Sequence, residues 1–299
     1  MAAPAHVLVL GMGYSGRHLA ALLQAEGIAC SGTVRDPGTA PDDGLTRYRL
    51  AEGVPVDDGL RAAIRRADAI VCSVPPEEAG DPAMRLLADA LHDSPALRWV
   101  GYLSSTAVYA DRDGGWVDEH SSADAGDDTA RRRLRAERQW RAFAQARGIA
   151  SAVLRLPALY GRGRNALVQL AQGKARHVVR PGLVFNRLHV EDLASAVLAA
   201  MRRASGHALH LPADDAPAPP QEVLAHAALL SGLPLPAAQA WDDPAVPASL
   251  RRFYSSNKRI DSRGTRAALQ WQPRFTSYRE GLADAWAAGD GRAAHDRWS

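Results

Sequence analysis

The sequence predicts an α/β protein: a doubly wound parallel sheet of the Rossmann type with a smaller C-terminal substrate lobe. Short apolar runs alternate with amphipathic segments over the first two-thirds of the chain, and a glycine-rich turn follows the first run. Such alternation is typical of a parallel sheet covered by helices on both faces. The composition changes at a Pro/Ala/Asp-rich stretch, 212–220. We therefore expect a Rossmann domain over 1–211, with 157–186 contributing to the lobe, and a lobe formed mainly by 212–299.

The first strand, helix and strand are marked by length and by glycine. Residues 6–10 form an apolar run that is too short for a helix and is followed at once by glycines, which favours a buried strand. Leu19, Leu22 and Leu23 lie at helical spacing within 14–26, and Gly27 is a good stop signal for that helix. A second apolar run predicts a strand over 28–34.

The rest of the sheet follows in the same way. Apolar runs predict strands at 69–74, 98–103 and 150–156, and the segments between them predict helices at 84–91 and 131–147. Gly148 ends the second of these helices. Beyond 220, short elements alternate with proline-rich stretches.

Charge and cysteine content exclude several classes of protein. The chain has 299 residues, 36 basic and 33 acidic side chains and a net charge of +3, a balance too weak to predict a nucleic-acid partner. No apolar stretch approaches the roughly 18 residues of a membrane span, and the N-terminus lacks the pattern of a secretory signal. Cys30 and Cys72 are too few for a disulfide framework, and as buried thiols they favour a reducing cytoplasm. The histidines show no metal-ligand spacing, so no metal is expected.

The turn after the first strand matches the pattern G-x-G-x-x-G. Gly11, Gly13 and Gly16 hold the three glycine positions, and Tyr14 and Ser15 lie between the last two. Between a strand and a helix, this pattern is typical of dinucleotide binding. The first glycine makes the tight turn, the second admits a pyrophosphate and the third lets the helix approach the strand. The helix N-terminus then presents free N–H groups to the phosphates.

The end of the second strand bears on which dinucleotide is bound. An acidic residue there would accept hydrogen bonds from the ribose hydroxyls of NAD, and Asp36 lies near the expected spacing. Arg35 precedes it and is suited to clamp the 2′-phosphate of NADP. We favour NADP as the cofactor and keep NAD as the alternative. Ser73 and Pro75 end the strand over 69–74, so we expect them in the ligand crevice at the carboxyl edge of the sheet.

Seven sequence blocks, in order, resemble the extended short-chain dehydrogenases/reductases, the NAD(P)-dependent epimerase/dehydratase-like proteins. They are the glycine loop and residues 103–109, 118–119, 155–161, 186–194, 257–260 and 271–275. The resemblance spans nearly the whole chain, and the shared order of the blocks carries it. Leu10 stands where the longer loop pattern of the extended family has a further glycine.

The resemblance implies a serine that holds the substrate oxygen and a Tyr-x-x-x-Lys pair. In that pair the tyrosine exchanges a proton, and the lysine lowers its pKa and binds the nicotinamide ribose. Ser105 occupies the serine position, whereas Thr129 and Arg133 occupy the tyrosine and lysine positions. Arg133 keeps the positive charge needed to bind ribose or phosphate. Threonine offers no hydroxyl of comparable acidity, so the usual proton-transfer residue is missing.

Tyr109 is the candidate replacement acid, because it belongs to the same block as Ser105. Its alternative role is only to line the pocket, since geometry must precede pKa arguments. Tyr160 and His189 are weaker candidates, and His189 is expected to be a structural histidine beside carboxylates. Asp192 is expected to cap the helix that follows.

Two functions are consistent with these observations. The first is an NAD(P)-dependent oxidoreductase or epimerase acting on a small polar substrate such as a sugar or nucleotide sugar, with Ser105, Tyr109 and Arg133 as catalytic candidates. Replacement of Ser105 or Tyr109 is then expected to remove turnover while NADPH still binds. The second is a non-catalytic sensor that binds NADP(H) and reports to a partner. The helix over 131–147 often joins a dimer interface in the family, so a homodimer is expected.

Overall fold

Seven parallel strands form the central sheet of the protein, for which we use a computed structural model that describes residues 4–292. Their order is β11-β7-β5-β4-β1-β2-β3. The strands are β1 (His6–Leu10), β2 (Ala29–Val34), β3 (Thr46–Arg49), β4 (Ala69–Cys72), β5 (Trp99–Ser105), β7 (Ala150–Leu156) and β11 (His207–His210).

The strand order makes the sheet doubly wound. The chain adds β2 and β3 on one side of β1 and then returns to add β4, β5, β7 and β11 on the other side. The predicted α/β Rossmann fold is therefore confirmed. A ligand crevice is expected where the direction of winding reverses, above the carboxyl ends of β1 and β4.

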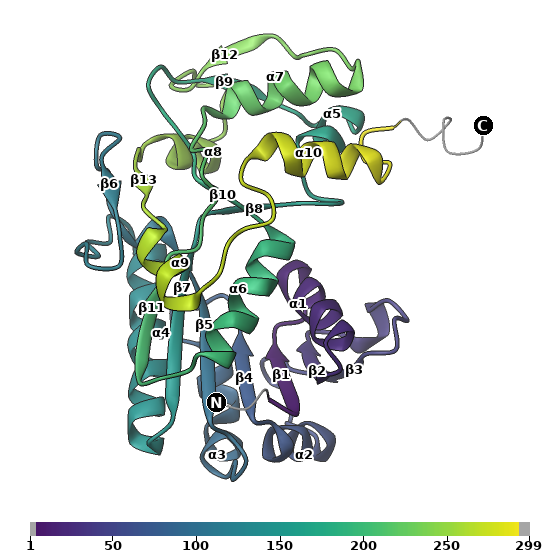
Figure 1. Cartoon of the computed structure of the whole chain (residues 1–299), viewed down its shortest axis with the longest axis vertical. Helices are drawn as coiled ribbons and strands as arrows, with labels where there is room; N and C mark the ends of the chain where they lie inside the picture. The colour runs from purple at the N-terminus through teal and green to yellow at the C-terminus, as the bar shows by residue number, and fades with distance from the viewer. Residues whose placement is uncertain (1–3, 293–299) are drawn as a thin grey trace.

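Helices cover both faces of the sheet, as Figure 1 shows. On one face α1 (Tyr14–Ala25) and α6 (Val190–Arg202) pack side by side, and their apolar residues join those of β1, β4, β5 and β7 in one core cluster. On the other face lie α2 (Asp58–Arg66), α3 (Pro82–His92) and α4 (Asp128–Arg147), which enclose a second cluster. Because both faces are covered, the inner strands are buried along most of their length rather than at alternate residues.

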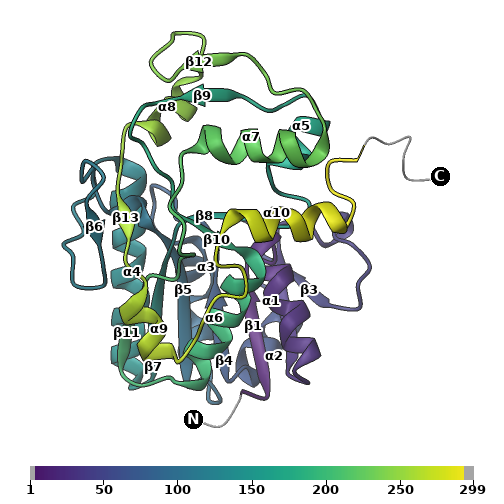
Figure 2. The same cartoon turned by 45° about the horizontal axis from the view of Figure 1, so that its top comes forward.

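A lobe sits over the carboxyl edge of the sheet, at the top of Figure 1 and turned forward in Figure 2. It contains α5 (Ala166–Ala171), α7 (Pro220–Ser231), α8 (Ala248–Tyr254), α10 (Tyr278–Ala287) and the parallel pair β9 (His177–Val179) and β12 (Ala238–Ala240). Two short parallel pairs lie between sheet and lobe: β8 (Ala158–Tyr160) with β10 (Arg187–His189), and β6 (Trp116–Val117) with β13 (Arg259–Ile260).

One segment of the last third returns to the sheet domain. The helix α9 (Arg263–Leu269) contacts α6 and β11, and Leu269 and Trp271 belong to the core cluster under α6. The Trp271 indole N–H also donates a hydrogen bond to Ser195 on α6 at 2.8 Å. We therefore propose a lobe built from 157–186 and 212–299 with the exception of this returning segment.

Three elements of the sheet domain were not predicted from the sequence: the strands β3 and β11 and the helix α2. The edge strand β3 is Thr-Arg-Tyr-Arg, with no buried residue, and α2 buries only Leu60, Ala63 and Ile64. Neither has the apolar run that marks the inner elements. The helix α4 also begins at Asp128, three residues before the predicted start, because the Asp127 carboxylate accepts a hydrogen bond from the Ala130 N–H and caps it.

Candidate functional site

The glycine loop is held in the tight form that the sequence pattern predicts. Gly11 has a φ of +91°, and a Cβ placed there would lie 2.7 Å from Ser73 Oγ. The Ser73 hydroxyl donates a hydrogen bond to the Gly11 carbonyl oxygen at 2.6 Å, which ties the end of β4 to the loop. At Gly16 a Cβ would lie 2.8 Å from the same carbonyl oxygen, so only glycine lets α1 approach this closely.

The middle of the loop fits an anionic group. A Cβ at Gly13 would meet no atom within 4 Å, so the space in front of it is open. The first-turn N–H groups of α1, at Tyr14, Ser15 and Gly16, have no hydrogen-bond acceptor among residues 4–292, and no side chain caps the helix. Free N–H groups and the positive end of the helix dipole favour a phosphate here. The residues present therefore fit a dinucleotide pyrophosphate.

The two candidates at the end of β2 differ in their local partners. The Asp36 carboxylate accepts a hydrogen bond from the Gly38 N–H at 3.1 Å and caps a 3₁₀ turn over Pro37–Thr39. Arg35 is exposed and forms no hydrogen bond or ion pair within the described part of the chain. Its charge is therefore available to an incoming ligand, whereas Asp36 already has a structural task.

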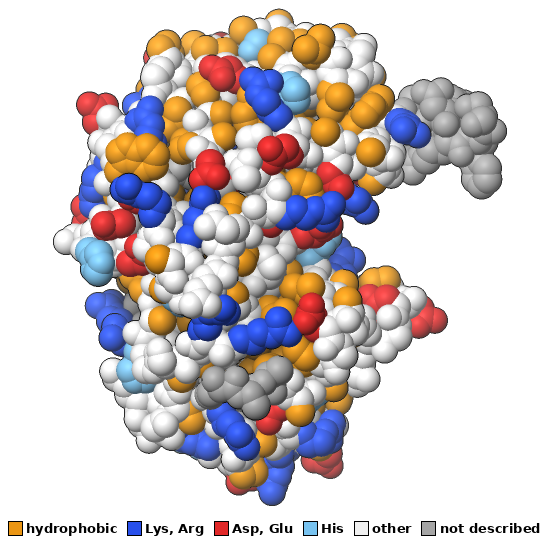
Figure 3. All heavy atoms as spheres, in the orientation of Figure 1, with side chains coloured by type: hydrophobic (Ala, Val, Ile, Leu, Met, Phe, Trp, Pro, Cys, Tyr) orange, Lys and Arg blue, Asp and Glu red, His pale blue; other side chains and the backbone are white. Residues whose placement is uncertain are grey.

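Ser105 lies at the carboxyl edge of the sheet, near the glycine loop. It ends β5, where it is half-buried, and its hydroxyl oxygen accepts a hydrogen bond from the Ala107 N–H at 3.1 Å. The hydroxyl hydrogen remains available to a substrate oxygen. Pro75 is exposed on the same edge, three residues beyond the last residue of β4. Figure 3 shows the surface hollowed between this edge and the α10 side of the lobe.

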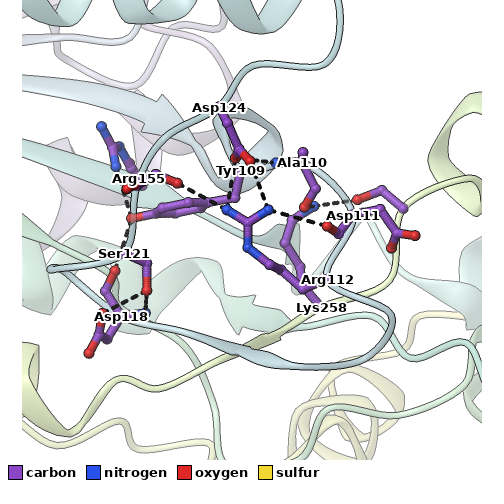
Figure 4. Close-up of polar contacts among 11 residues, drawn as sticks. Tyr109, Ala110, Asp111, Arg112, Asp118, Ser121, Asp124, Arg155 and Lys258 are labelled. Carbon is purple, nitrogen blue, oxygen red and sulfur yellow. Dashed lines mark hydrogen bonds and ion pairs between the residues drawn. The ribbon is translucent and has the colours of Figure 1, made fainter.

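Tyr109 lies inside the protein rather than facing a substrate. Only 1% of it is exposed. Its hydroxyl donates a hydrogen bond to the Asp118 carbonyl oxygen at 3.1 Å and accepts one from Arg155 Nη1 at 2.9 Å (Figure 4). Burial raises the pKa of this phenol, against the opposing effect of Arg155. This geometry favours a structural role for Tyr109 over proton transfer.

A buried ion pair beside Tyr109 was not predicted from the sequence. Arg155 on β7 and Glu137 on α4 are joined by two hydrogen bonds, at 3.2 and 2.8 Å, and their side chains are each 9% exposed. The Ser104 hydroxyl donates a further hydrogen bond to Glu137 at 2.5 Å. The only sequence signal is a charge inside an apolar strand and one on the inner face of α4. The network fixes α4 against β5, which ends at Ser105, and against β7.

Thr129 and Arg133, the residues expected at the family's tyrosine and lysine positions, lie on the first turns of α4. Thr129 is exposed, and its hydroxyl oxygen accepts a hydrogen bond from Arg252 Nη1 on α8 at 3.4 Å. Arg133, one turn further on, is half-buried, and its charge acts on the pKa of Tyr102. At the expected tyrosine position the chain thus has a neutral hydroxyl that accepts a hydrogen bond from the lobe.

His189, rather than Asp192, caps α6. His189 is the N-cap of α6, and its Nδ1 accepts a hydrogen bond from the Glu191 N–H at 3.3 Å. The prediction that Asp192 caps the helix is wrong. Its carboxylate instead accepts hydrogen bonds from the Arg274 and Phe275 N–H groups, at 2.6 and 3.0 Å, and anchors the returning segment to α6. Burial raises the pKa of Asp192 to about 6 and lowers that of His189 to about 4.

Residues 4–292 contain neither a candidate metal site nor a candidate membrane-spanning helix. No group of three or more histidine, cysteine, aspartate or glutamate side chains is arranged to hold a metal ion. Within the same residues, no helix combines the length and the hydropathy needed to cross a lipid bilayer.

The fold and the glycine loop together define a Rossmann protein with a built dinucleotide site. A sequence model of the NAD dependent epimerase/dehydratase family matches residues 7–211. The chain therefore belongs to that family, and the expected membership is confirmed.

Similar proteins include one with an assigned reaction. A 3-diazoavenalumate denitrifying reductase from Streptomyces sp. is 28% identical over an alignment of 305 positions that covers 92% of this chain and 98% of the relative. A functionally unknown conserved protein from Silicibacter pomeroyi is 35% identical, with a TM-score of 0.85 and coverage of 96% and 99%. MoeE5 in complex with UDP-glucuronic acid and NAD is 23% identical, with a TM-score of 0.72 and coverage of 93% and 97%, and shares the fold.

Proposed function

We propose that this protein is an NADP(H)-dependent reductase of a small polar substrate whose reduction needs no tyrosine proton. A bound nicotinamide supplies the hydride in such a reaction. The chain's own contribution is to orient the acceptor with Ser105, to hold the ribose side with Arg133 and to close the edge of the sheet with the lobe. The observation that carries the proposal is Thr129, an exposed neutral hydroxyl in the place of the family's acid.

This position separates a reductase from an epimerase. An epimerase that oxidises and re-reduces a sugar hydroxyl must take up and return the hydroxyl proton, which requires a positioned acid and base. A threonine hydroxyl cannot do this near neutral pH. Tyr109, the nearest phenol in the same block, has both a donor and an acceptor partner inside the protein. The site therefore supports one-way hydride addition better than reversible oxidation of an alcohol.

The Streptomyces relative suggests one class of hydride acceptor, because its name gives a diazo compound as the substrate of that relative. When hydride replaces dinitrogen at an arenediazonium carbon, a C–H bond forms and the C–N bond breaks with its electron pair leaving on N₂. The balance includes no proton. An acceptor of this kind would need only binding and orientation from residues such as Ser105 and Arg133.

The cofactor is proposed as NADP(H) on the evidence at the end of β2. Arg35 is exposed and unpaired within the described residues, whereas Asp36 is engaged with Gly38. A guanidinium binds a 2′-phosphate through two parallel hydrogen bonds. NAD has no 2′-phosphate and cannot form this contact.

The reaction is tested with NADPH that carries deuterium at the transferable position. The purified protein is incubated with an arenediazonium salt, an aldehyde or UDP-glucose, and the products are analysed by mass spectrometry. Deuterium bound to carbon in the arene formed from the diazonium salt supports the reductase. Deuterium in an alcohol formed from the aldehyde would contradict a site without an acid, because the alkoxide must take up a proton. Conversion of UDP-glucose into its epimer without net consumption of cofactor would overturn the reductase. A Ser105→Ala variant should bind NADPH normally and lose about tenfold or more in turnover, as expected for a lost orienting contact.

The alternative is the non-catalytic NADP(H) sensor, and the same threonine favours it because the family's acid is missing. A sensor would bind NADPH through the glycine loop and Arg35 and transfer deuterium to none of the three compounds.

Homodimerisation through α4 and a cytoplasmic location remain separate proposals. Sedimentation should test the first, since the exposed face of α4 carries Arg131, Arg135 and Arg138, whose charges oppose a close approach of two copies.

A further inference from the structure

Arg187 is a buried arginine whose charge has no contacting counter-charge. Only 7% of it is exposed. Its Nη1 donates hydrogen bonds to the Phe185 and Ala218 carbonyl oxygens, both at 3.0 Å, and it forms no ion pair within residues 4–292. Burial lowers its pKa, with Asp214 acting in the opposite direction. Burying a charge without a partner is costly, so such a group calls for a reason.

The unused donors of Arg187 are not sealed inside the protein. Its Nε and Nη2 donate to no atom of the described residues, yet neither is among the fully enclosed polar atoms that lack a partner. The same holds for the hydroxyl of Tyr254, at the end of α8. The Tyr254 ring packs against Phe185, whose carbonyl oxygen accepts a hydrogen bond from Arg187, so the two groups are neighbours. Burial raises the pKa of the Tyr254 hydroxyl, and the charge of Arg187 opposes the rise. Two open donors therefore share one region.

The strand registers bring this region close to the reaction edge. Ser105 at the end of β5 is opposite Leu156 of β7, and Ala158, two residues further along the chain, is opposite Arg187 of β10. Two extended residues span about 7 Å. Arg187 thus stands on the carboxyl side of the sheet just beyond Ser105, between the sheet and the lobe.

Aromatic side chains border the two donors. The rings of Phe185 and Tyr254 have their centroids 5.3 Å apart in an edge-to-face arrangement, and Arg187 lies 5.9 Å from the centroid of the Tyr278 ring. A guanidinium and a hydroxyl beside aromatic rings suit an oxyanion carried on a flat apolar body. The backbone N–H of the buried Asp214 donates a hydrogen bond to the Arg187 carbonyl oxygen at 2.9 Å. Its carboxylate forms no ion pair with the Arg187 guanidinium, and Oδ2 has no partner within residues 4–292.

We propose that Arg187 and Tyr254 form a subsite that binds the oxyanion, a carboxylate or a phosphate, of the substrate. The inference rests on the proposed function, since it names the substrate class of that same site. The oxyanion would supply the charge that Arg187 lacks, and its binding would set the distance between the reacting carbon and Ser105. Arg187 and Tyr254 are thus binding residues that select anionic substrates.

The test is a calorimetric titration of the NADPH-loaded protein with benzoate, its neutral isostere benzamide, UDP and inorganic phosphate. Binding of benzoate without benzamide assigns a carboxylate, and binding of UDP or phosphate assigns a phosphate. In either case Arg187→Gln should weaken the binding at least tenfold, and Arg187→Lys should restore part of it. Equal binding of benzoate and benzamide, or no anion bound at all, would overturn the proposal.

The chain offers a matched control. Arg279 is exposed and stacks on the same Tyr278 ring, at 5.1 Å, so Arg279→Gln removes the same charge outside the subsite and should leave anion binding unchanged. If Arg187→Gln fails to fold, Tyr254→Phe removes a single hydroxyl and should still weaken anion binding. Anion binding that is unaffected in Tyr254→Phe and in every folded Arg187 variant would refute the subsite. Retained NADPH binding and deuterium transfer would then leave the reductase proposal standing.

Discussion

Arg155 donates a hydrogen bond from Nη1 to the Tyr109 hydroxyl at 2.9 Å, and its guanidinium also lies 5.0 Å from the centre of the Tyr109 ring. The Tyr109 hydroxyl in turn donates a hydrogen bond to the Asp118 carbonyl oxygen. The Tyr109 hydroxyl therefore both donates and accepts a hydrogen bond inside the protein, which gives this side chain a structural role. Tyr109 joins the end of β5 to the loop that leads into α4.

The first prediction separates bracing from proton transfer at Tyr109. Tyr109→Phe should lower the free energy of unfolding by about 1–3 kcal/mol, because Arg155 and Asp118 each lose a buried partner. Turnover of the folded variant should stay within a few fold of the original. Urea unfolding and deuterium transfer measure the two effects. A loss of turnover of ~100-fold or more with stability unchanged would instead identify Tyr109 as the acid.

The second prediction concerns the glycine loop. Gly13→Ala should leave the free energy of unfolding nearly unchanged, because the added methyl group meets no protein atom, and should weaken NADPH binding by occupying the space of the pyrophosphate. Gly16→Ala is the contrasting variant. Its methyl group would lie 2.8 Å from the Gly11 carbonyl oxygen and should destabilise the fold even without ligand. If Gly13→Ala binds NADPH as tightly as the parent, the pyrophosphate does not lie on this loop.

A third prediction tests the choice of dinucleotide. Arg35→Ala should weaken NADPH binding by about 10- to 100-fold, the value of one or two charge-assisted hydrogen bonds, and should leave NADH binding unchanged. Asp36→Asn is the control, since the amide oxygen still accepts from Gly38. Equal effects of Arg35→Ala on both dinucleotides would remove the basis for preferring NADP.

The fourth prediction uses the buried carboxyl of Asp214. Burial raises its pKa to about 7, well above the usual value of about 4, so between these pH values the native state binds more protons than the unfolded state. The contribution of Asp214 to stability therefore falls as pH rises through this window. Asp214→Asn stays neutral, and it should gain stability relative to the parent from pH 4 to about 7. Urea unfolding at a series of pH values measures the difference, and a constant difference would mean that the pKa is not raised.

The sequence predicts those features that depend on local pattern. Apolar runs located the inner strands to within two residues at each end, and the glycine spacing located the nucleotide loop. The polar edge strand β3 was not predicted, because it forms only by pairing with β2 in the folded protein. Its four residues are exposed or half-exposed and carry no apolar pattern. The same limit applies to the site.

Arg187 shows the limit most clearly. It lies in one of the blocks that resemble the family, yet nothing local distinguishes it from the many arginines of this chain. Its significance arises from the lobe, which brings Tyr254 and Tyr278 around it from 67 and 91 residues further along the chain. Tyr109 is the converse case, since only the fold brings Arg155 to its hydroxyl and so changes the role expected for it.

The most direct test of the account is a side-by-side calorimetric titration of the purified protein with NADPH and with NADH. We expect one site per chain, with NADPH bound at least tenfold more tightly than NADH. Preference for NADH would move the ribose contact from Arg35 to Asp36 or elsewhere and contradict the 2′-phosphate clamp. Binding of neither dinucleotide would contradict the central claim, because the open glycine loop would then serve no cofactor and neither a reductase nor a nicotinamide sensor would remain.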